Sequence, residues 1–390
     1  MRRLLGLVML FSAVSVYAGE GDTLRPFVNA SMGYDSNLFR FASDAEAAAS
    51  TVGVSAIPSV TYQRYGAGVD LDWKQGRQAV TGRIAADKTS FSKFSSLLDY
   101  TGRDINAAWK WQLGNRWSGL LSASQNRTLA PYSDFLTGTI GSNVRTDDRQ
   151  TFQADYWFHS DWRARAGFSN FSSAYSAASQ STRDNQNKRA TLGLYRLGQT
   201  IESVGVELSS TQGSYNSLPT SDFREQGLRL LGIWNYSGIS RFTGRVGYVQ
   251  RNRQSLVGKD YSGPDWRLEA RWLPTGKTQF EGAFYRDLRA NDTAPSGYEV
   301  VDGISLSAVW LVAPKTRLIG QGSYERIEYQ GSAQSDKVAS LGLSASYEVW
   351  PGGEISAGLQ HSQRQSNASI AGSSPAFDAD TFFVSANLKF

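Results

Sequence analysis

The sequence contains no cysteine, and only ten of its 390 residues are proline. The missing thiols exclude disulfide bridges and every metal site built on cysteine. An exported chain of this length without disulfides is typical of the bacterial periplasm or outer membrane. A membrane-spanning helix needs about 20 apolar residues in a row, and no such run occurs after residue 20. We therefore expect no helical anchor in the mature chain.

Recognisable catalytic groups are equally scarce. The chain has two histidines, His159 and His361, and neither a phosphate-binding glycine loop nor a spaced set of metal ligands. His361 precedes Ser362, which leaves open a hydrolase with a base-activated serine, but no third orienting group follows at a recognisable spacing. The segment 378–380, D-A-D, resembles a fragment of a calcium loop that lacks its other ligands. We expect no enzymatic activity, no cofactor, no metal and no nucleic-acid partner.

The first 18 residues have the features of a secretory signal peptide. A basic start, M-R-R, precedes an apolar run over 4–16, and V-Y-A at 16–18 is a small-residue cleavage site. A membrane-spanning helix is the alternative, which the shortness of the run disfavours. We predict a signal peptide over 1–18 and a short periplasmic segment over 19–26. Cleavage would leave 38 basic and 35 acidic residues, a net charge of +3.

Alternating apolar and polar residues are what the sequence has in abundance. The last ten residues, 381–390, read T-F-F-V-S-A-N-L-K-F, and every second residue counted back from Phe390 is apolar. Successive side chains of a strand point to opposite faces, so this segment has one apolar and one polar face. The same alternation recurs along most of the chain, over spans of roughly 10–14 residues that suffice for a tilted strand across a bilayer.

Short turns and longer polar stretches separate these alternating segments in turn. Eight short turns carry the Gly, Pro, Asn and Asp residues that hairpins favour. With nine longer connections they make 17 links and hence 18 strands. Short turns at one end and long loops at the other are typical of a bacterial outer-membrane barrel. We predict an all-β fold, a transmembrane antiparallel β-barrel of about 18 strands over residues 27–390, in the outer membrane of a Gram-negative bacterium. A large β-sandwich is the alternative. The short turns are at 74–77, 113–115, 160–161, 198–200, 237–238, 274–276, 312–315 and 351–353.

Tryptophan supports the barrel independently. Ten of the eleven tryptophans lie within about four positions of a short turn. Tryptophan prefers the membrane–water interface, where its ring is half buried and its N–H is hydrated. We predict a girdle in contact with outer-membrane lipid at the periplasmic rim. Its candidates are Trp73, Trp109, Trp111, Trp117, Trp157, Trp162, Trp234, Trp272, Trp310 and Trp350.

Arginine dominates the polar face of the predicted strands between residues 229 and 289. Eighteen strands leave an aqueous channel, so a basic strip on its wall would attract anionic solutes. Acids alternate with these arginines, which leaves a second interpretation open, in which ion pairs brace the wall. The predicted basic, pore-lining path consists of Arg163, Arg165, Arg229, Arg241, Arg245, Arg251, Arg267, Arg271 and Arg289.

Four stretches in the first half of the sequence are similar to segments of a known protein family. They are D-T-L-R-P-F-V-N-A-S-M-G-Y-D-S-N-L-F at 22–39, Y-G-A-G-V-D-L-D-W at 65–73, L-D-Y-T-G at 98–102 leading to W-Q-L-G-N-R-W at 111–117, and D-W-R-A-R-A-G at 161–167. They resemble the EpsL-type outer-membrane proteins of exopolysaccharide systems in Gram-negative bacteria. The resemblance implies a barrel that works beside a periplasmic polysaccharide-export protein and serves as the outlet for the polymer. It supplies no catalytic residues.

These observations predict a pore through which an exopolysaccharide leaves the cell. A general or anion- or sugar-selective diffusion porin and a structural surface barrel closed by loops are the alternatives. Gating is expected from the longest loops, 36–58 and 129–146, or from another protein. The last strand is expected to pair with the strand that begins near Phe27, and Phe390 is expected to be the signal that the barrel-assembly machinery recognises.

Overall fold

The fold is taken from a computed structural model of the whole chain. It describes residues 23–132, 142–198, 201–253, 260–290, 298–329, 333–367 and 376–390. The predicted signal peptide, residues 19–22 of the segment after it and parts of several long loops, among them 133–141 and 254–259, lie outside these ranges.

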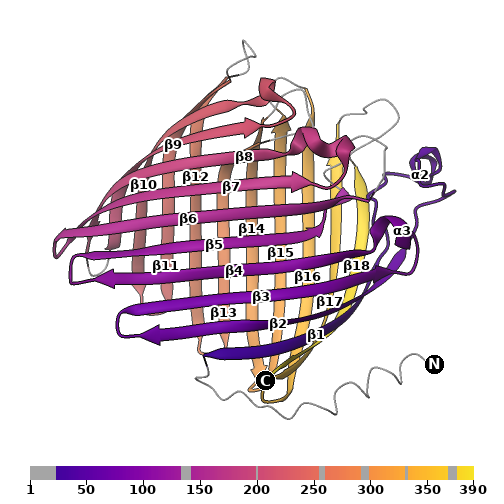
Figure 1. The fold of residues 1–390 in the computed structure, drawn as a ribbon, viewed down its shortest axis with the longest axis horizontal. Helices are drawn as coiled ribbons and strands as arrows, with labels where there is room; N and C mark the ends of the chain where they lie inside the picture. The colour runs from indigo at the N-terminus through magenta and orange to yellow at the C-terminus, as the bar shows by residue number, and fades with distance from the viewer. Residues whose placement is uncertain are drawn as a thin grey trace.

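Eighteen antiparallel strands form one closed barrel (Figure 1). Each strand pairs with its neighbours in the sequence, and β18 pairs with β1 from Phe27 opposite Lys389 to Asp35 opposite Thr381. Both the strand count and the predicted closure of the last strand on the first are confirmed. The strands are β1 (Leu24–Asp35), β2 (Val60–Gln75), β3 (Gln78–Phe91), β4 (Tyr100–Leu113), β5 (Trp117–Leu129), β6 (Val144–His159), β7 (Trp162–Tyr175), β8 (Asn185–Leu197), β9 (Ile201–Tyr215), β10 (Phe223–Ser237), β11 (Ser240–Arg253), β12 (Tyr261–Thr275), β13 (Thr278–Ala290), β14 (Tyr298–Ala313), β15 (Thr316–Tyr329), β16 (Ser335–Trp350), β17 (Gly353–Ser366) and β18 (Phe377–Lys389).

The apolar face of each strand points outward. Leu228 and Leu230 on β10 are 52% and 55% exposed, whereas Arg229 between them is only 4% exposed on the inner side. A soluble sandwich would bury these leucines, so their exposure fits a wall that lipid covers. Polar residues at the alternate positions face the lumen. Among the described residues, no helix is long and apolar enough to cross a bilayer.

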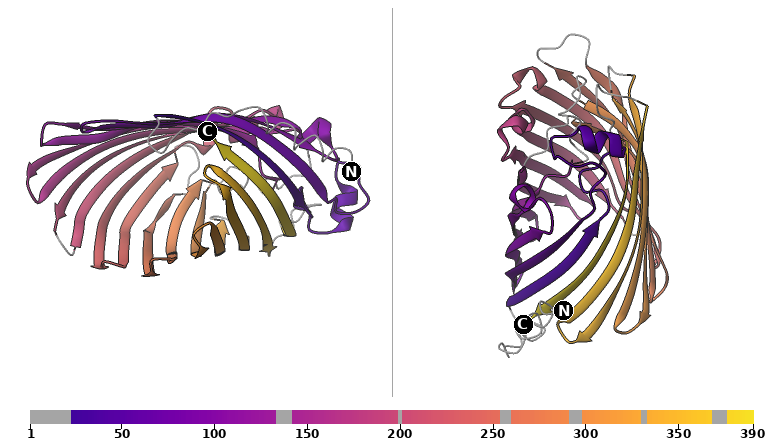
Figure 2. Two further views of the ribbon diagram at one scale, coloured as in Figure 1. Left: turned by 90° about the horizontal axis from the view of Figure 1, so that it is seen from below. Right: turned by 90° about the vertical axis from the view of Figure 1, so that its right-hand side faces the viewer.

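The barrel is flattened, so that two broad walls face each other (Figure 2). One wall begins with the first strands of the chain, the other contains the orange and yellow strands near its end, and the sheet bends between them. Short hairpins join the strands at one end. Gly76, Gly114 and Gly352 in these hairpins have φ of 58°, 58° and 82°, a region that residues with a Cβ rarely adopt.

The loops of the first strands pack together at the opposite end of the barrel. The alanine-rich run at 45–49, whose conformation the pattern alone does not determine, lies in helix α2 (Asp44–Ala49), which begins where Ser43 Oγ accepts the Glu46 N–H at 3.2 Å. Helix α3 (Ser95–Leu98) joins β3 to β4. Two short 3-10 turns, η3 (Ala178–Arg183) and η4 (Pro219–Ser221), lie in later loops.

An apolar cluster holds these first loops in place. Phe39 stacks edge-on against Phe94 and Tyr132, with ring centroids 5.3 and 4.9 Å apart, and Ala47 and Leu98 are fully buried beside them. Burial raises the pKa of the Tyr132 phenol to about 12, so it stays neutral at physiological pH. The loops at 36–58 and 95–98 and the start of 129–146 therefore form one packed unit.

Candidate functional site

All nine arginines of the predicted path lie at inward positions of their strands. They occur on β7, β10, β11, β12 and β13, and each shares its face with polar or small residues rather than with the exposed apolar row. The strand register decides this placement, because outward residues such as Leu230, Val246 and Trp266 pair with one another across β10–β12. Residues 229–289 do span four neighbouring strands.

Two of these arginines are buried within the wall. Arg229 Nε lies 3.0 Å from Asp265 Oδ1, and its Nη1 donates to Ser209 Oγ at 2.6 Å. Arg251 Nη2 lies 2.7 Å from Glu225 Oε2. Burying a charge is strongly unfavourable unless a partner and hydrogen bonds compensate. Arg229 and Arg251 therefore brace the wall, as the second interpretation of the sequence predicted.

Three further arginines of this region remain open to the lumen. Arg245, Arg267 and Arg289 have side chains 32–38% exposed, and each has a carboxylate partner. Arg245 and Arg267 share Asp287, with nitrogen–oxygen distances of 3.0 and 2.8 Å. Arg245 also lies 3.5 Å from Asp265 and Arg267 lies 3.5 Å from Glu269, so both guanidinium groups are held between carboxylates while about a third of each side chain stays exposed to the lumen.

A cavity of about 440 Å³ lies among these side chains, on the lumen side of β6–β13. Six arginines line it, against three carboxylates. Arg149 stacks over the Phe171 ring at 4.9 Å, and no described carboxylate lies within ion-pairing distance of it. Glu207 and Glu325 pair with two of these arginines, Arg189 at 3.4 Å and Arg289 at 2.6 Å, so the lining and its partners together have an excess of one positive charge. The arginines are Arg149, Arg189, Arg229, Arg245, Arg251 and Arg289, and the acids are Glu225, Asp265 and Asp287.

Four members of this lining, Arg149, Arg189, Glu225 and Asp265, were missed by the sequence interpretation. Strand parity could have found them: Arg189 alternates with the outward Leu192 and Leu194 row, and Glu225 shares the face of Arg229.

The other predicted arginines lie nearer the short turns. Arg165 Nε contacts Asp155 Oδ1 at 2.7 Å, and Arg163 contacts the same carboxylate at 3.6 Å. Arg241 pairs with Glu202 at 3.0 Å. Arg271 pairs with Glu281 at 3.7 Å. Each predicted arginine therefore has a carboxylate partner.

A second cavity, of about 760 Å³, lies along the lumen side of β11–β16. One side carries Arg241, Arg267 and Arg271, and the other is a row of hydroxyl and amide groups. These small neutral side chains are Ser305, Ser307, Gln321, Ser323 and Ser340. The groove offers many weak hydrogen-bonding groups and few aromatic surfaces.

The tryptophan girdle is outside the barrel, with one exception. Trp73, Trp117, Trp162, Trp234, Trp272, Trp310 and Trp350 are 36–50% exposed on the outer wall beside short hairpins, and Trp109 and Trp111 share the outward face of β4. Trp157 differs, because its ring faces the lumen and contacts Arg163. Alternation from Tyr156 and Phe158, both outward, places it there. The contact of the others with lipid stays a prediction.

The last residue lies at the seam of the barrel. Phe390 N–H donates to Pro26 O at 2.9 Å, which extends the β1–β18 pairing to the end of the chain. Its proposed recognition by the assembly machinery is a separate matter, which stays a prediction.

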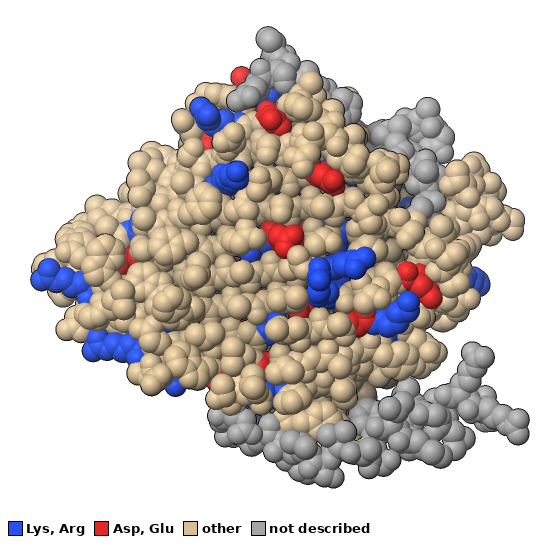
Figure 3. Space-filling view, viewed as in Figure 1, with Lys and Arg blue, Asp and Glu red and all other residues tan. Residues whose placement is uncertain are grey.

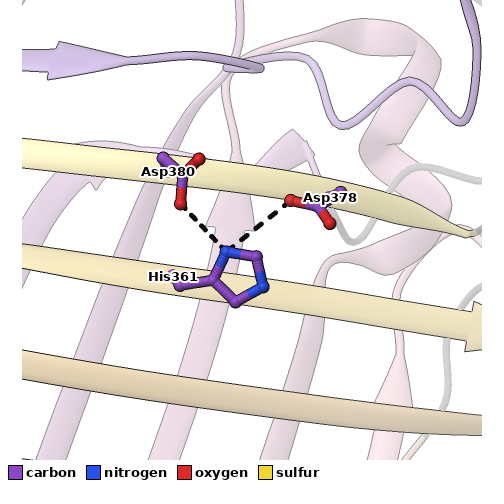
Figure 4. A group of neighbouring side chains, drawn as sticks. All are labelled: His361, Asp378 and Asp380. Carbon is purple, nitrogen blue, oxygen red and sulfur yellow. Dashed lines mark hydrogen bonds and ion pairs between the residues drawn. The ribbon is translucent and has the colours of Figure 1, made fainter.

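Neither histidine forms a catalytic arrangement. His361 points outward from β17 while Ser362 points into the lumen, so the two cannot act together. His361 Nδ1 instead lies 2.9 Å from Asp380 and 3.7 Å from Asp378 on β18 (Figure 4). The three side chains are exposed on the outer surface. Near the other histidine, Ser160 Oγ lies 3.3 Å from His159 Nδ1 and donates to Asp161 Oδ1 at 2.9 Å. The Asp161 backbone N–H donates to the same ring nitrogen at 3.2 Å, so no carboxylate orients this exposed imidazole as a triad would require.

Comparison with known proteins agrees with this geometry. A family model described as "Putative beta-barrel porin 2" matches residues 241–390. OccK2 (OpdF) of Pseudomonas aeruginosa is similar in structure, with 10% identity, a TM-score of 0.51, and 94% of this chain and 98% of that chain covered. OccK1 (OpdK) of the same species has 13% identity and a TM-score of 0.51, with 94% of this chain and 99% of that chain covered. A BenF-like porin from Pseudomonas fluorescens Pf-5 has 11% identity and a TM-score of 0.51, with 94% of this chain and 98% of that chain covered. No curated protein matches the sequence.

The chain is an outer-membrane β-barrel with the 18-stranded porin fold. The short hairpins are accordingly at its periplasmic end and the packed loops at its extracellular end. At these levels of identity the similar structures establish the fold, and what passes through the lumen must be argued from its lining.

Proposed function

We propose that this barrel is a passive diffusion pore that favours small hydrophilic anions, such as organic acids and sugar acids. The observation that supports the proposal is the lining of the 440 Å³ cavity, where six arginines meet five carboxylates once Glu207 and Glu325 are counted, and where Arg149 has no described carboxylate partner. An excess of one charge on a low-dielectric wall concentrates the opposite ion in the lumen.

The ion pairs keep an anion from binding too tightly to the wall, so that it can pass through. Arg245, Arg267 and Arg289 are held in place by Asp287 and Glu325, so an anion meets preoriented donors. The carboxylate partners also compete with the solute, which keeps each contact weak. Weak binding at several successive positions is what conduction requires.

The test is the reversal potential of the purified barrel in a planar bilayer under a salt gradient. We expect anion selectivity, and we expect it to fall in a variant carrying Arg245→Gln, Arg267→Gln and Arg289→Gln. The matched control is Arg83→Gln on β3, whose arginine pairs with Asp70 at 2.7 Å in a different part of the lumen wall. Cation selectivity of the unmodified barrel would contradict the proposal.

Export of an exopolysaccharide is the second candidate, and the hydroxyl-lined groove favours it. Ser305, Ser323 and their neighbours could exchange hydrogen bonds with the hydroxyl groups of a sugar chain along some 760 Å³ of lumen. The sequence resemblance to EpsL-type proteins points the same way. Such a pore would take the polymer from a periplasmic export protein docked at the short-hairpin rim.

Deleting the gene separates the two candidates. If the barrel exports polymer, the polymer should accumulate in the periplasm and disappear from the cell surface. Surface polymer at its normal level, together with slower uptake of organic acids, would contradict polymer export and support the anion pore.

A further inference from the structure

Three basic residues gather on the outer wall near the extracellular ends of β3, β4 and β5. Arg103 and Arg127 are direct cross-strand partners, and Lys88 lies opposite Thr101 on the same outward face. All three side chains are exposed. Figure 3 shows basic side chains gathering over this part of the wall. We call Lys88, Arg103 and Arg127 the basic triad.

The triad has no acidic partner in the described part of the chain. Directly opposed side chains on one face have Cβ atoms about 4.5–5.5 Å apart, and like charges at such positions destabilise a sheet. The outward acid Asp148 on β6 lies opposite Gln125 and accepts a hydrogen bond from it at 2.8 Å. Among the described residues, the juxtaposition of Arg103 and Arg127 is therefore not compensated by an acid.

The opposite part of the same rim is built differently. Outward Arg286 on β13 lies 3.6 Å from Asp302, and outward Arg326 on β15 lies 2.8 Å from Glu328. Outward Arg224 on β10, like the triad, has no carboxylate partner among the described residues. Arg103 and Arg127 differ from it because they are direct cross-strand neighbours.

The triad lies in the upper part of the membrane-spanning wall. Arg103 lies eight residues along β4 from Trp111, and Trp111 belongs to the periplasmic girdle. At about 3.3 Å per residue and a tilt near 45°, this separates them by about 19 Å along the membrane normal. The apolar band of such barrels is about 25 Å tall, so long side chains at this position reach the outer head groups.

We propose that the basic triad binds the phosphate groups of the phosphorylated glycolipid that forms the outer leaflet. Paired guanidinium groups match phosphate oxygens in a bidentate manner, and the lysine adds a third positive charge. Outward Ile84 and Ile105, next to the triad on the membrane side, would contact the acyl chains of the same molecule. The site lies on the outer wall and does not depend on what the lumen transports.

The experiment measures lipid binding to the purified full-length barrel in detergent. The unmodified protein should bind lipid A and gain thermal stability from it. The double variant Arg103→Gln and Arg127→Gln should bind at least tenfold more weakly and lose that gain. The control variant, Arg286→Gln and Arg326→Gln, removes two outward arginines from the paired part of the rim and should bind lipid A normally.

Two further arms identify the source of the phosphate and guard against misfolding. Dephosphorylated lipid A, phosphatidylglycerol and inorganic phosphate should each stabilise the barrel less than lipid A does. The variant Arg103→Lys and Arg127→Lys keeps the charge and should retain most of the binding. Equal binding by the glutamine variant, or equal stabilisation by phosphatidylglycerol or inorganic phosphate, would overturn the proposal.

Discussion

Two parts of the lumen lining, on β10–β13 and on β14–β16, differ in the residue types that face the lumen. On β10–β13, long arginines meet carboxylates from strands one or two positions away, as Arg229 on β10 meets Asp265 on β12. On β14–β16, the inward positions of the groove are Ser305, Ser307, Gln321 and Ser323. We call these the charged wall and the hydroxyl wall. The charged wall fills space and is held by ion pairs, whereas the hydroxyl wall leaves space open.

The two walls should differ in how strongly a substitution affects the stability of the barrel. A buried ion pair contributes little net free energy, yet removing one partner is costly because the other charge stays buried. A solvated serine on an open groove carries no such penalty. The charged wall should therefore be sensitive to single substitutions and the hydroxyl wall tolerant of them.

The largest effect is expected from Asp265→Ala. It leaves the guanidinium of Arg229, which is only 4% exposed, without its main partner, and removes a contact of Arg245. The free energy of unfolding should fall by about 3–5 kcal/mol. Urea titration in detergent, followed by heat-modifiable electrophoretic mobility, measures it. The matched change Ser305→Ala on the hydroxyl wall should cost about 0.5 kcal/mol or less; similar losses for both would erase the distinction between the walls.

A smaller effect is expected when the whole pair is replaced by apolar residues. The double variant Arg229→Met and Asp265→Leu removes both charges and keeps the volume. It should recover most of the loss caused by Asp265→Ala, to within about 1–2 kcal/mol of the unmodified barrel. The same unfolding titration applies. A double variant as unstable as the single one would mean that the pair acts through geometry rather than charge.

The smallest effect is expected from Ser307→Trp on the hydroxyl wall. The ring narrows the groove without changing its charge, so single-channel conductance should fall while ion selectivity stays the same. Arg267→Gln on the charged wall should do the reverse, because it changes charge and hardly any volume. If both variants altered selectivity alike, the two walls would not have separate roles.

The sequence predicted the strands and their faces because a period of two leaves each residue only two choices. The arginines of the path could therefore be assigned to the lumen from alternation alone. Their partners could not, because alternation does not fix the register between strands: Arg229 and Asp265 lie on either side of Gly247 on β11, which has no side chain to separate them. Arg251 likewise lies directly opposite Glu225. Trp157 was misplaced because proximity to a turn does not specify a face.

The loop unit illustrates a second limit. The alanine-rich run could not be assigned because alanine suits a helix without requiring one. The Ser43 cap and the burial of Ala47 against Phe39, Phe41 and Leu98 decide its conformation. These contacts join loops that are far apart in the sequence.

The seam between β1 and β18 has a consequence for the order of biogenesis. The bond from Phe390 N–H to Pro26 O joins the residue that follows β18 to the first strand. The barrel can therefore close only after β18 has been delivered beside β1, and pairings so distant in sequence form slowly. Until then β1 and β18 each expose an unpaired strand edge, which is open to non-native pairing.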